Sequence, residues 1–243
     1  MSQITKLPHD SESVPVVREN PSDAPRPIQQ IRSSYRQSEL PKLYFGKLHF
    51  CFTTLFSLTG IGFCALSLQH VTGLEWLTVP LTFLYANFVE YLGHRWPMHR
   101  PYPFVRLVFD GHTHIHHRFY TEEAFAYEKT DDFHALLLPP YLIVFFLGLF
   151  ALPVGAFLYW LLSPNVGFLF VATALGYFLN YELLHFCYHA PENSWMFWLP
   201  FMRRLRKHHQ THHNPKLMTR YNFNITYPIF DWVFRTSYRG KLR

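Results

Sequence analysis

The chain has 243 residues, of which 49% are hydrophobic, 19% are aromatic and only 16% are charged. Because typical soluble domains carry roughly 25% charged residues, this composition argues against an ordinary soluble protein. The net charge of +6 points to an anionic partner, either lipid or nucleic acid. The three cysteines form no C-x-x-C pair, which argues against a disulfide framework and against a thiolate zinc site.

Residues 1–42 form a polar front with few large apolar side chains. Its six prolines are Pro8, Pro15, Pro21, Pro25, Pro27 and Pro41. Such a segment cannot bury enough apolar surface to order itself, so we expect a disordered N-terminal tail over residues 1–42 and a membrane-embedded domain over residues 43–243. No apolar h-region follows the basic residues of the tail, and we therefore do not expect a secretory signal peptide.

Two apolar segments follow the tail. Residues 50–68 are nineteen residues without a charge, about the length that spans a hydrocarbon core as a helix. Residues 76–89 are fewer, but the apolar character continues through Tyr91 and Leu92 to His94. We expect these segments to be two membrane-spanning helices joined by a short turn near residues 70–73.

A third apolar region, residues 135–181, contains no charged residue. As one helix it would extend about 70 Å, at about 1.5 Å per residue, which is more than twice the thickness of a bilayer core. The region must therefore turn once, and Ser163-Pro164-Asn165 is its natural turn sequence. Pro153 is expected to kink the first of the two helices. The sequence thus predicts an all-α integral membrane bundle of four helices, arranged as two hairpins.

The basic residues predict the orientation of this bundle. All 22 lysines and arginines lie in the tail, between the second and third spans, or after the fourth span. By the positive-inside rule that face, with both termini, is cytoplasmic, and this placement favours lipid over nucleic acid as the partner. The aromatic run at residues 195–202, followed by basic residues up to Lys207, is expected to lie in the headgroup layer.

Twelve of the sixteen histidines fall into four clusters, all on the predicted cytoplasmic side. They are His94 and His99; His112, His114, His116 and His117; His185 and His189; and His208, His209, His212 and His213. Neutral imidazole is the commonest metal ligand, and an all-nitrogen set suits iron, zinc or copper. Eight to ten histidines exceed the coordination sphere of one ion. We therefore expect a cytoplasmic, histidine-rich helical cap that holds a dinuclear metal site.

The spacing within the clusters is suited to converging rings. His185 and His189 are four residues apart, so both rings project from one helix face. Pro97 lies between His94 and His99, which predicts that a helix ends there and that the two rings approach each other from a bend. A two-metal site of this kind at a lipid surface fits the activation of O₂ by iron and attack on an unactivated C–H bond.

The order of these motifs resembles that of the fatty acid hydroxylase superfamily, membrane non-haem di-iron enzymes that include sterol desaturases and fatty acid 2-hydroxylases. The pattern is His-x4-His, a box ending in His-His, His-x3-His and His-x2-His-His, with supporting segments at residues 181–185 and 231–236. The likeness covers roughly residues 74–239. In the second box Thr113 stands where the family has a histidine, which leaves His112 and His114 as alternative ligands.

The resemblance implies a set of ligands and a reaction. The implied ligands are His94, His99, His112, His116, His117, His185, His189, His209, His212 and His213. Glu182, three residues before His185, is a candidate either to orient a ligand or to face the headgroups. The implied reaction is O₂-dependent hydroxylation of a fatty acyl or related lipid by two iron ions, for which zinc is a substitute in vitro.

Such a reaction consumes electrons from outside the chain. The sequence has no haem-binding domain, no dinucleotide fingerprint and no cysteine set for an iron–sulfur cluster. We therefore expect an external electron donor, such as cytochrome b5 or a ferredoxin, to dock on the basic cytoplasmic face.

Other functions fit parts of the pattern. A lipid desaturase or a sterol or carotenoid oxidase would use the same machinery, and the substrate class stays open. A metal-ion transporter belongs to a different class, but transporters place ligands near the bilayer midplane and use carboxylates within their spans. A membrane scaffold with zinc-stabilised loops would need the metals without O₂ chemistry. Histidines crowded at one surface, beside spans almost free of charge, favour the enzyme.

Overall fold

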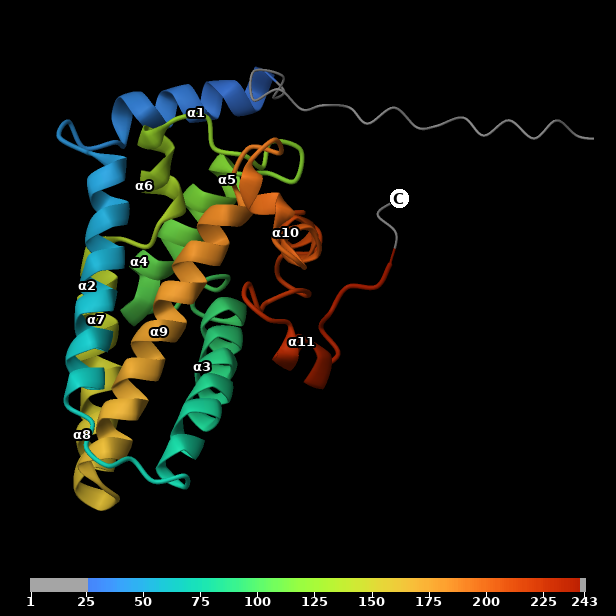
Figure 1. Ribbon diagram of the computed structural model, residues 1–243. Coiled ribbons are helices and arrows are strands. Elements are labelled where there is room, and N and C mark those ends of the chain that lie inside the picture. The colour runs from blue at the N-terminus through green and yellow to red at the C-terminus, as the bar shows by residue number, and fades with distance from the viewer. Residues whose placement is uncertain (1–25, 241–243) are drawn as a thin grey trace, which may run out of the picture.

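Long helices lie side by side in the structure, and shorter helices gather over one end of them (Figure 1). The computed structural model describes residues 26–240, which contain helices and no strand, so the predicted all-α fold is confirmed. The long elements are α2 (Gly46–Leu66), α3 (Thr78–Arg95), α7 (Pro140–Phe146), α8 (Leu152–Leu161) and α9 (Pro164–Tyr188). The remaining α-helices are α1 (Arg26–Ser38), α4 (Arg106–Phe109), α5 (His117–Phe119), α6 (Phe133–Leu136), α10 (Met202–His212) and α11 (Ile229–Val233).

The long helices form two hairpins whose turns bind each other. The α8–α9 turn lies at the predicted Ser163-Pro164-Asn165, where the Ser163 side chain accepts the N–H of Val166 and caps α9. Asn165 donates to the Gln69 carbonyl at 2.7 Å, and Ser163 donates to the Glu75 carboxylate at 2.5 Å. These bonds join the two turns at the end of the bundle opposite the shorter helices.

Three helical segments are long and apolar enough to cross a membrane: Gly46–Leu66, Thr130–Leu161 and Pro164–Tyr188. α3 is a helix of 18 residues in the predicted place, but it is not among the three because it carries Glu90, Arg95 and other polar residues. The fourth membrane span therefore stays a prediction. α9 is the most buried of the three spans, since α2, α3 and α8 pack around it.

The second hairpin depends on a close approach between two glycines. A Cβ atom on Gly167 of α9 would lie 2.6 Å from the Cβ of Tyr159 and 2.8 Å from the carbonyl oxygen of Gly155 in α8. Small residues of this kind let helix backbones approach within a membrane. The predicted irregularity at Pro153 takes the form of a π-helical segment, Leu147–Ala151, just before it. Proline lacks the N–H that would continue regular α-helical bonding there.

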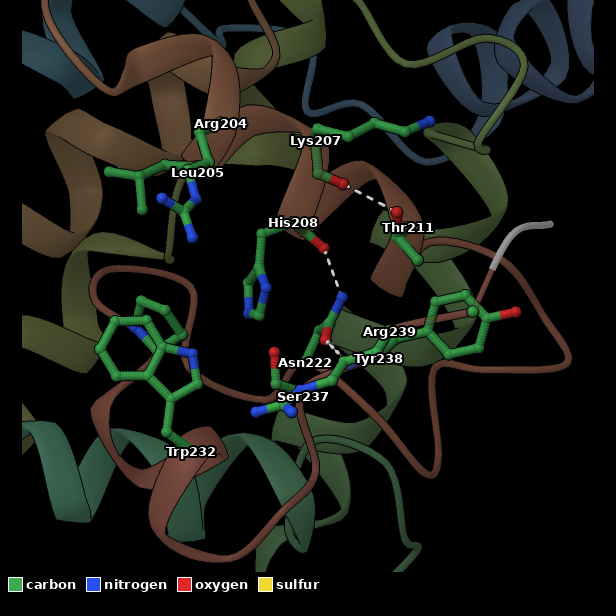
Figure 2. Close-up of a pocket in the computed structure, with 12 residues that line it drawn as sticks. Arg204, Leu205, Lys207, His208, Thr211, Asn222, Trp232, Ser237, Tyr238 and Arg239 are labelled. Atoms are coloured by element: carbon green, nitrogen blue, oxygen red, sulfur yellow. Dashed lines mark hydrogen bonds between the residues drawn. The ribbon is translucent and has the colours of Figure 1, made fainter.

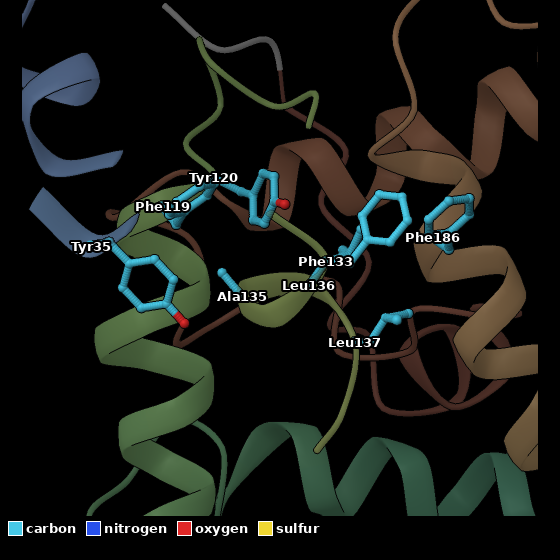
Figure 3. Packing of buried hydrophobic residues seen from close by; sticks show 8 residues of the cluster. All are labelled: Tyr35, Phe119, Tyr120, Phe133, Ala135, Leu136, Leu137 and Phe186. Atoms are coloured by element: carbon cyan, nitrogen blue, oxygen red, sulfur yellow. The ribbon is translucent and has the colours of Figure 1, made fainter. Parts of the chain in front are cut away.

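An aromatic and aliphatic cluster connects the bundle to α1 and to the short helices (Figure 3). Tyr35 of α1 packs edge-on against Phe119 of α5, with ring centroids 5.4 Å apart. Phe133 of α6 packs against Phe186 of α9 at 5.0 Å. The cluster therefore fixes the segment between the hairpins to the end of α9. That segment carries the second of the four histidine clusters of the sequence, residues 112–117.

α1 corrects the predicted disorder of residues 1–42 for residues 26–42, whereas residues 1–25 lie outside the described residues. Arg32 of α1 is 1% exposed. Its Nε donates to the Phe119 carbonyl at 3.0 Å, its Nη2 donates to the Ala124 carbonyl at 2.6 Å, and its Nη1 pairs with Glu128 at 2.7 Å. The low content of large apolar residues led us to predict disorder here. The helix is nevertheless held against the rest of the protein, mainly by the buried guanidinium of Arg32.

We expect Arg32→Gln to destabilise the protein, because it leaves two buried carbonyl acceptors without their donor and removes one of the two arginines that pair with Glu128. Removing one partner of a buried ion pair costs about 3 kcal/mol. Thermal unfolding in detergent micelles measures the effect, with Arg118→Gln as the control, since Arg118 is exposed. Equal melting temperatures for the two variants would show that the Arg32 contacts add nothing to stability.

Candidate metal centre

The histidines predicted as ligands meet at one end of the bundle and are all buried. None of the ten is more than 8% exposed. His114 is different, since its side chain is 51% exposed and lies 3.0 Å from Asp110. His208 lies 3.3 Å from the buried carboxylate of Asp231. The structure therefore brings together the ten candidates that the sequence indicates and leaves these two histidines at the margin.

The buried rings form two groups whose ligand atoms lie within 4.8 Å of one another. The first group contains His94, His99, His112, His117 and His212. The second group contains His116, His189, His209 and His213, and His185 adjoins it with its Nε2 3.2 Å from the Nε2 of His116. The groups touch, because the rings of His117 and His213 stack with centroids 4.2 Å apart.

The spacing of the nitrogen atoms fits shared metal ions. The Nε2 atoms of His94 and His112 are 2.9 Å apart, as are those of His99 and His212. In the second group, the Nε2 atoms of His189 and His209 are 3.2 Å apart. Two nitrogens bound at a right angle to one ion, each at about 2.1 Å, would be separated by about 3.0 Å. Both groups therefore have the donor set and the spacing that a bound ion requires.

Five of these rings are oriented by a hydrogen bond from their Nδ1 nitrogen to a backbone carbonyl. The Nδ1–H groups and their acceptors are His94 to Phe223 (2.5 Å), His116 to Ala135 (2.9 Å), His189 to Phe125 (2.7 Å), His212 to Tyr221 (2.9 Å) and His213 to Tyr120 (2.5 Å). A hydrogen on Nδ1 leaves the lone pair on Nε2, which points into the group. The rings are thus held in the tautomer that binds a metal through Nε2.

A π-helix, Asp110–His116, explains how the second sequence cluster serves both groups. In a π-helix residues five apart share a face, and the Nε2 atoms of His112 and His117 are 3.1 Å apart in the first group. His116, on another face, belongs to the second group. His114 points out of the centre, so the geometry favours His112 of the two alternatives.

Thr113, which stands where the expected pattern has a histidine, contacts one of the ligand rings. Its hydroxyl donates to the Met98 carbonyl at 2.6 Å and lies 3.3 Å from the Nδ1 of His99. Because the hydroxyl hydrogen is used by Met98, Thr113 accepts a hydrogen bond from His99. Sequence reasoning treated Thr113 as a missing ligand and did not foresee that it orients one.

Burial keeps the imidazoles neutral. Loss of solvent lowers the pKa of His99 to about 2 and that of His116 to about 4. The pKa values of His209 and His213 are lowered well below 6.5 for the same reason, with repulsion from neighbouring histidines as a second cause. The rings are therefore unprotonated at neutral pH, the state in which imidazole binds a metal.

Three carboxylates hold the segments that supply the orienting carbonyls. Glu182 is 2% exposed and accepts the N–H of Leu138, three residues after Ala135, at 3.3 Å. Its carboxylate is therefore buried and does not face the headgroups. Among the described residues it accepts no hydrogen bond from a ligand ring. Sequence reasoning had left these as its two alternatives.

The other two carboxylates hold the C-terminal loop. Asp231 accepts the N–H groups of Phe223 and Asn224 at 3.0 and 2.8 Å. Glu90, on α3 one turn before His94, accepts the N–H groups of residues 225 and 226 and the Tyr177 hydroxyl. Sequence reasoning did not single out Glu90, although a lone carboxylate within a predicted span was a signal of function.

Comparisons with known proteins agree with this geometry. A family model described as fatty acid hydroxylase matches residues 79–236. Among solved structures, the chain is similar to full-length Scs7p, of which only the hydroxylase domain is visible, with 22% identity and a TM-score of 0.58. The match covers 78% of this chain and 67% of that one, and it shows a common fold. No match was found among curated proteins.

We expect His112→Ala to lower the metal content of the purified chain relative to the intact chain, because it removes one of five donors from the first group. His114→Ala is the matched control and should leave the metal content unchanged, since His114 lies outside the groups. Elemental analysis by mass spectrometry measures the metal per chain. Loss of metal in the control with full retention in His112→Ala would reverse the assignment.

Proposed function

The chain belongs to the fatty acid hydroxylase family, and we propose that it is a membrane-bound hydroxylase that uses O₂ to insert oxygen into a C–H bond of a fatty acyl chain or related lipid. The observation that carries the proposal is the convergence of ten buried imidazoles, in two touching groups, at one end of apolar helices. A hydroxylase needs its oxidant beside lipid and away from bulk water, and this arrangement meets both needs.

We propose that the two groups each hold one iron ion, with His112 and not His114 in the first group and His185 completing the second. Bound iron would supply the capacity to activate O₂ with electrons from a donor. Zinc would fit the same nitrogen donors and is expected to replace iron in vitro without supporting the reaction.

The residues of the chain contribute orientation and exclusion of water. Five carbonyls fix the tautomer of their histidines, and the Thr113 hydroxyl orients His99. These bonds restrict the orientations of the rings, which would lower the cost of ordering the side chains around bound ions. The low exposure of the rings keeps bulk water away from the place where the C–H bond would be attacked.

The electrons are proposed to come from a separate protein, such as cytochrome b5 or a ferredoxin, because the chain contains no redox cofactor motif of its own. Exposed basic residues near the centre, including Arg100, Arg118 and Arg220, provide charge that would attract an acidic donor. Dependence of the reaction on added donor and reductant tests this part of the proposal.

The reaction is tested by lipid mass spectrometry on cells that express the intact chain or His185→Ala, and on the purified protein with donor, reductant and O₂. We expect lipids that have gained one oxygen atom with the intact chain, and loss of at least about 100-fold of this product with His185→Ala, because removal of one ligand disrupts the second group. His114→Ala should retain activity.

Other products would redirect the proposal. Lipids that have lost two hydrogens would identify desaturation by the same machinery. Metal uptake into sealed vesicles without any lipid product would favour a transporter, and metal binding with neither outcome would favour a zinc-stabilised scaffold.

We further propose that the histidine end, with the described ends of the chain, faces the cytoplasm. All basic residues lie at this end of the predicted spans, as the positive-inside rule requires. A cysteine introduced at Gln69, in a hairpin turn, should react with a membrane-impermeant maleimide from outside intact cells, while one at Glu123 should react after permeabilisation. The opposite pattern would invert the topology.

A further inference from the structure

α11 lies deeper along the bundle than the histidines. Its Phe230 packs against Phe88 of α3 with ring centroids 5.0 Å apart, and the neighbouring Phe234 packs against Tyr91 at the same distance. Phe88 precedes His94 by six residues, or about 9 Å along a helix. α11 therefore lies beside α3, and Figure 1 shows it below α10, toward the hairpin turns.

The outward face of α11 is apolar and uncovered within the described structure. Trp232 and Val233 are 55% and 61% exposed. A short apolar helix at this depth, containing a tryptophan, has the features of a segment that lies in the boundary between headgroups and acyl chains. The space directly above α11, on the side of α10, is therefore at the level of lipid headgroups.

A pocket of about 1090 Å³ occupies that space, between α10, α11 and the C-terminal segment (Figure 2). Figure 2 shows the Arg204 side chain and the His208 ring directed toward the same space, with the Trp232 indole on its α11 side. Lys207 and Arg239 also line the pocket. The pocket is thus basic on the side of α10 and aromatic on the side of the membrane.

The positive charge of this pocket is not neutralised by the described residues. Arg204, Lys207 and Arg239 form no ion pair with any described acidic side chain, and no acidic residue lines the pocket. Asp231 is near, next to His208, but it is fully buried and already accepts three other hydrogen bonds, from Phe223, Asn224 and Thr236. An anion in the pocket would therefore meet uncompensated cations.

We propose that this pocket binds the phosphate group of a membrane lipid. Arginine binds phosphate through paired N–H donors, and basic pockets near the bilayer surface bind anionic headgroups. The lipid's acyl chains would lie against the apolar face of α11, which gives that face a partner. The site is separate from the histidine centre and does not depend on the reaction proposed above.

Native mass spectrometry of the full chain, ejected from phosphatidylcholine nanodiscs that contain phosphatidylglycerol, tests the proposal by counting retained phosphatidylglycerol. We expect one retained molecule for the intact chain and a drop of about tenfold or more for Arg204→Gln/Arg239→Gln, which removes two of the cations. The matched control is Arg203→Gln/Lys216→Gln, at two exposed basic residues that do not line the pocket. Its retention should equal that of the intact chain, and all three proteins should have equal metal content.

Several outcomes would overturn the proposal. Equal retention in all three proteins would exclude a lipid site, and an equal loss in the control would show attraction to diffuse surface charge. Calorimetric titration of the protein with inorganic phosphate, in phosphatidylcholine nanodiscs, tests whether the pocket binds free phosphate instead of a lipid headgroup. Phosphate binding that needs Arg204 and Arg239, with unchanged lipid retention, would reassign the pocket to that anion. Unchanged lipid retention with weaker binding of an acidic electron-donor protein would reassign it to a protein partner.

Discussion

The structure of the centre depends on one kind of interaction, the hydrogen bond from an imidazole Nδ1–H to a backbone carbonyl. Five histidines make it, and every acceptor lies outside the four histidine clusters of the sequence. Each acceptor must itself be held in place, because a displaced carbonyl would turn its ring. The carboxylates of Glu182, Asp231 and Glu90 meet this need by accepting N–H groups near those carbonyls. The centre is thus a network of two layers, in which the rings bind carbonyls and neighbouring N–H groups of the same segments bind carboxylates.

Each of the two histidine groups takes its members from several helical segments, and some of these segments contribute to both groups. α10 contributes His212 to the first group and His209 to the second, and His213, the residue after the helix, also belongs to the second, since successive residues face different directions. The π-helix does the same for His112 and His117 on one side and His116 on the other. Consequently the first group requires α3, the segment between the hairpins and α10 to fold together, and the second group requires the end of α9 as well as that segment and α10.

Much of this arrangement could be predicted from the sequence, because it follows from length, charge and spacing. The charge-free regions predicted the helices, Ser163-Pro164-Asn165 gave the turn, and the clusters gave the candidate ligands. What escaped prediction depends on contacts between distant residues. The attachment of α1 by Arg32, the acceptor role of Thr113 and the bracing by Glu90 leave no periodic pattern in the sequence. α3 is also less apolar than the three membrane-length segments, because it carries polar residues such as Glu90 and His94 that belong to the centre or hold it in place.

The π-helix has a consequence for how the chain can vary in length. Its wider turn places His112 and His117 on one face over an interval that an α-helix would not match. Deletion of a single residue between them would rotate one ring away from the other, whatever residue was lost. Insertions and deletions should therefore be rejected between residues 110 and 117. In this protein the spacing of residues 110–117 is under constraint as well as the identity of the histidines among them.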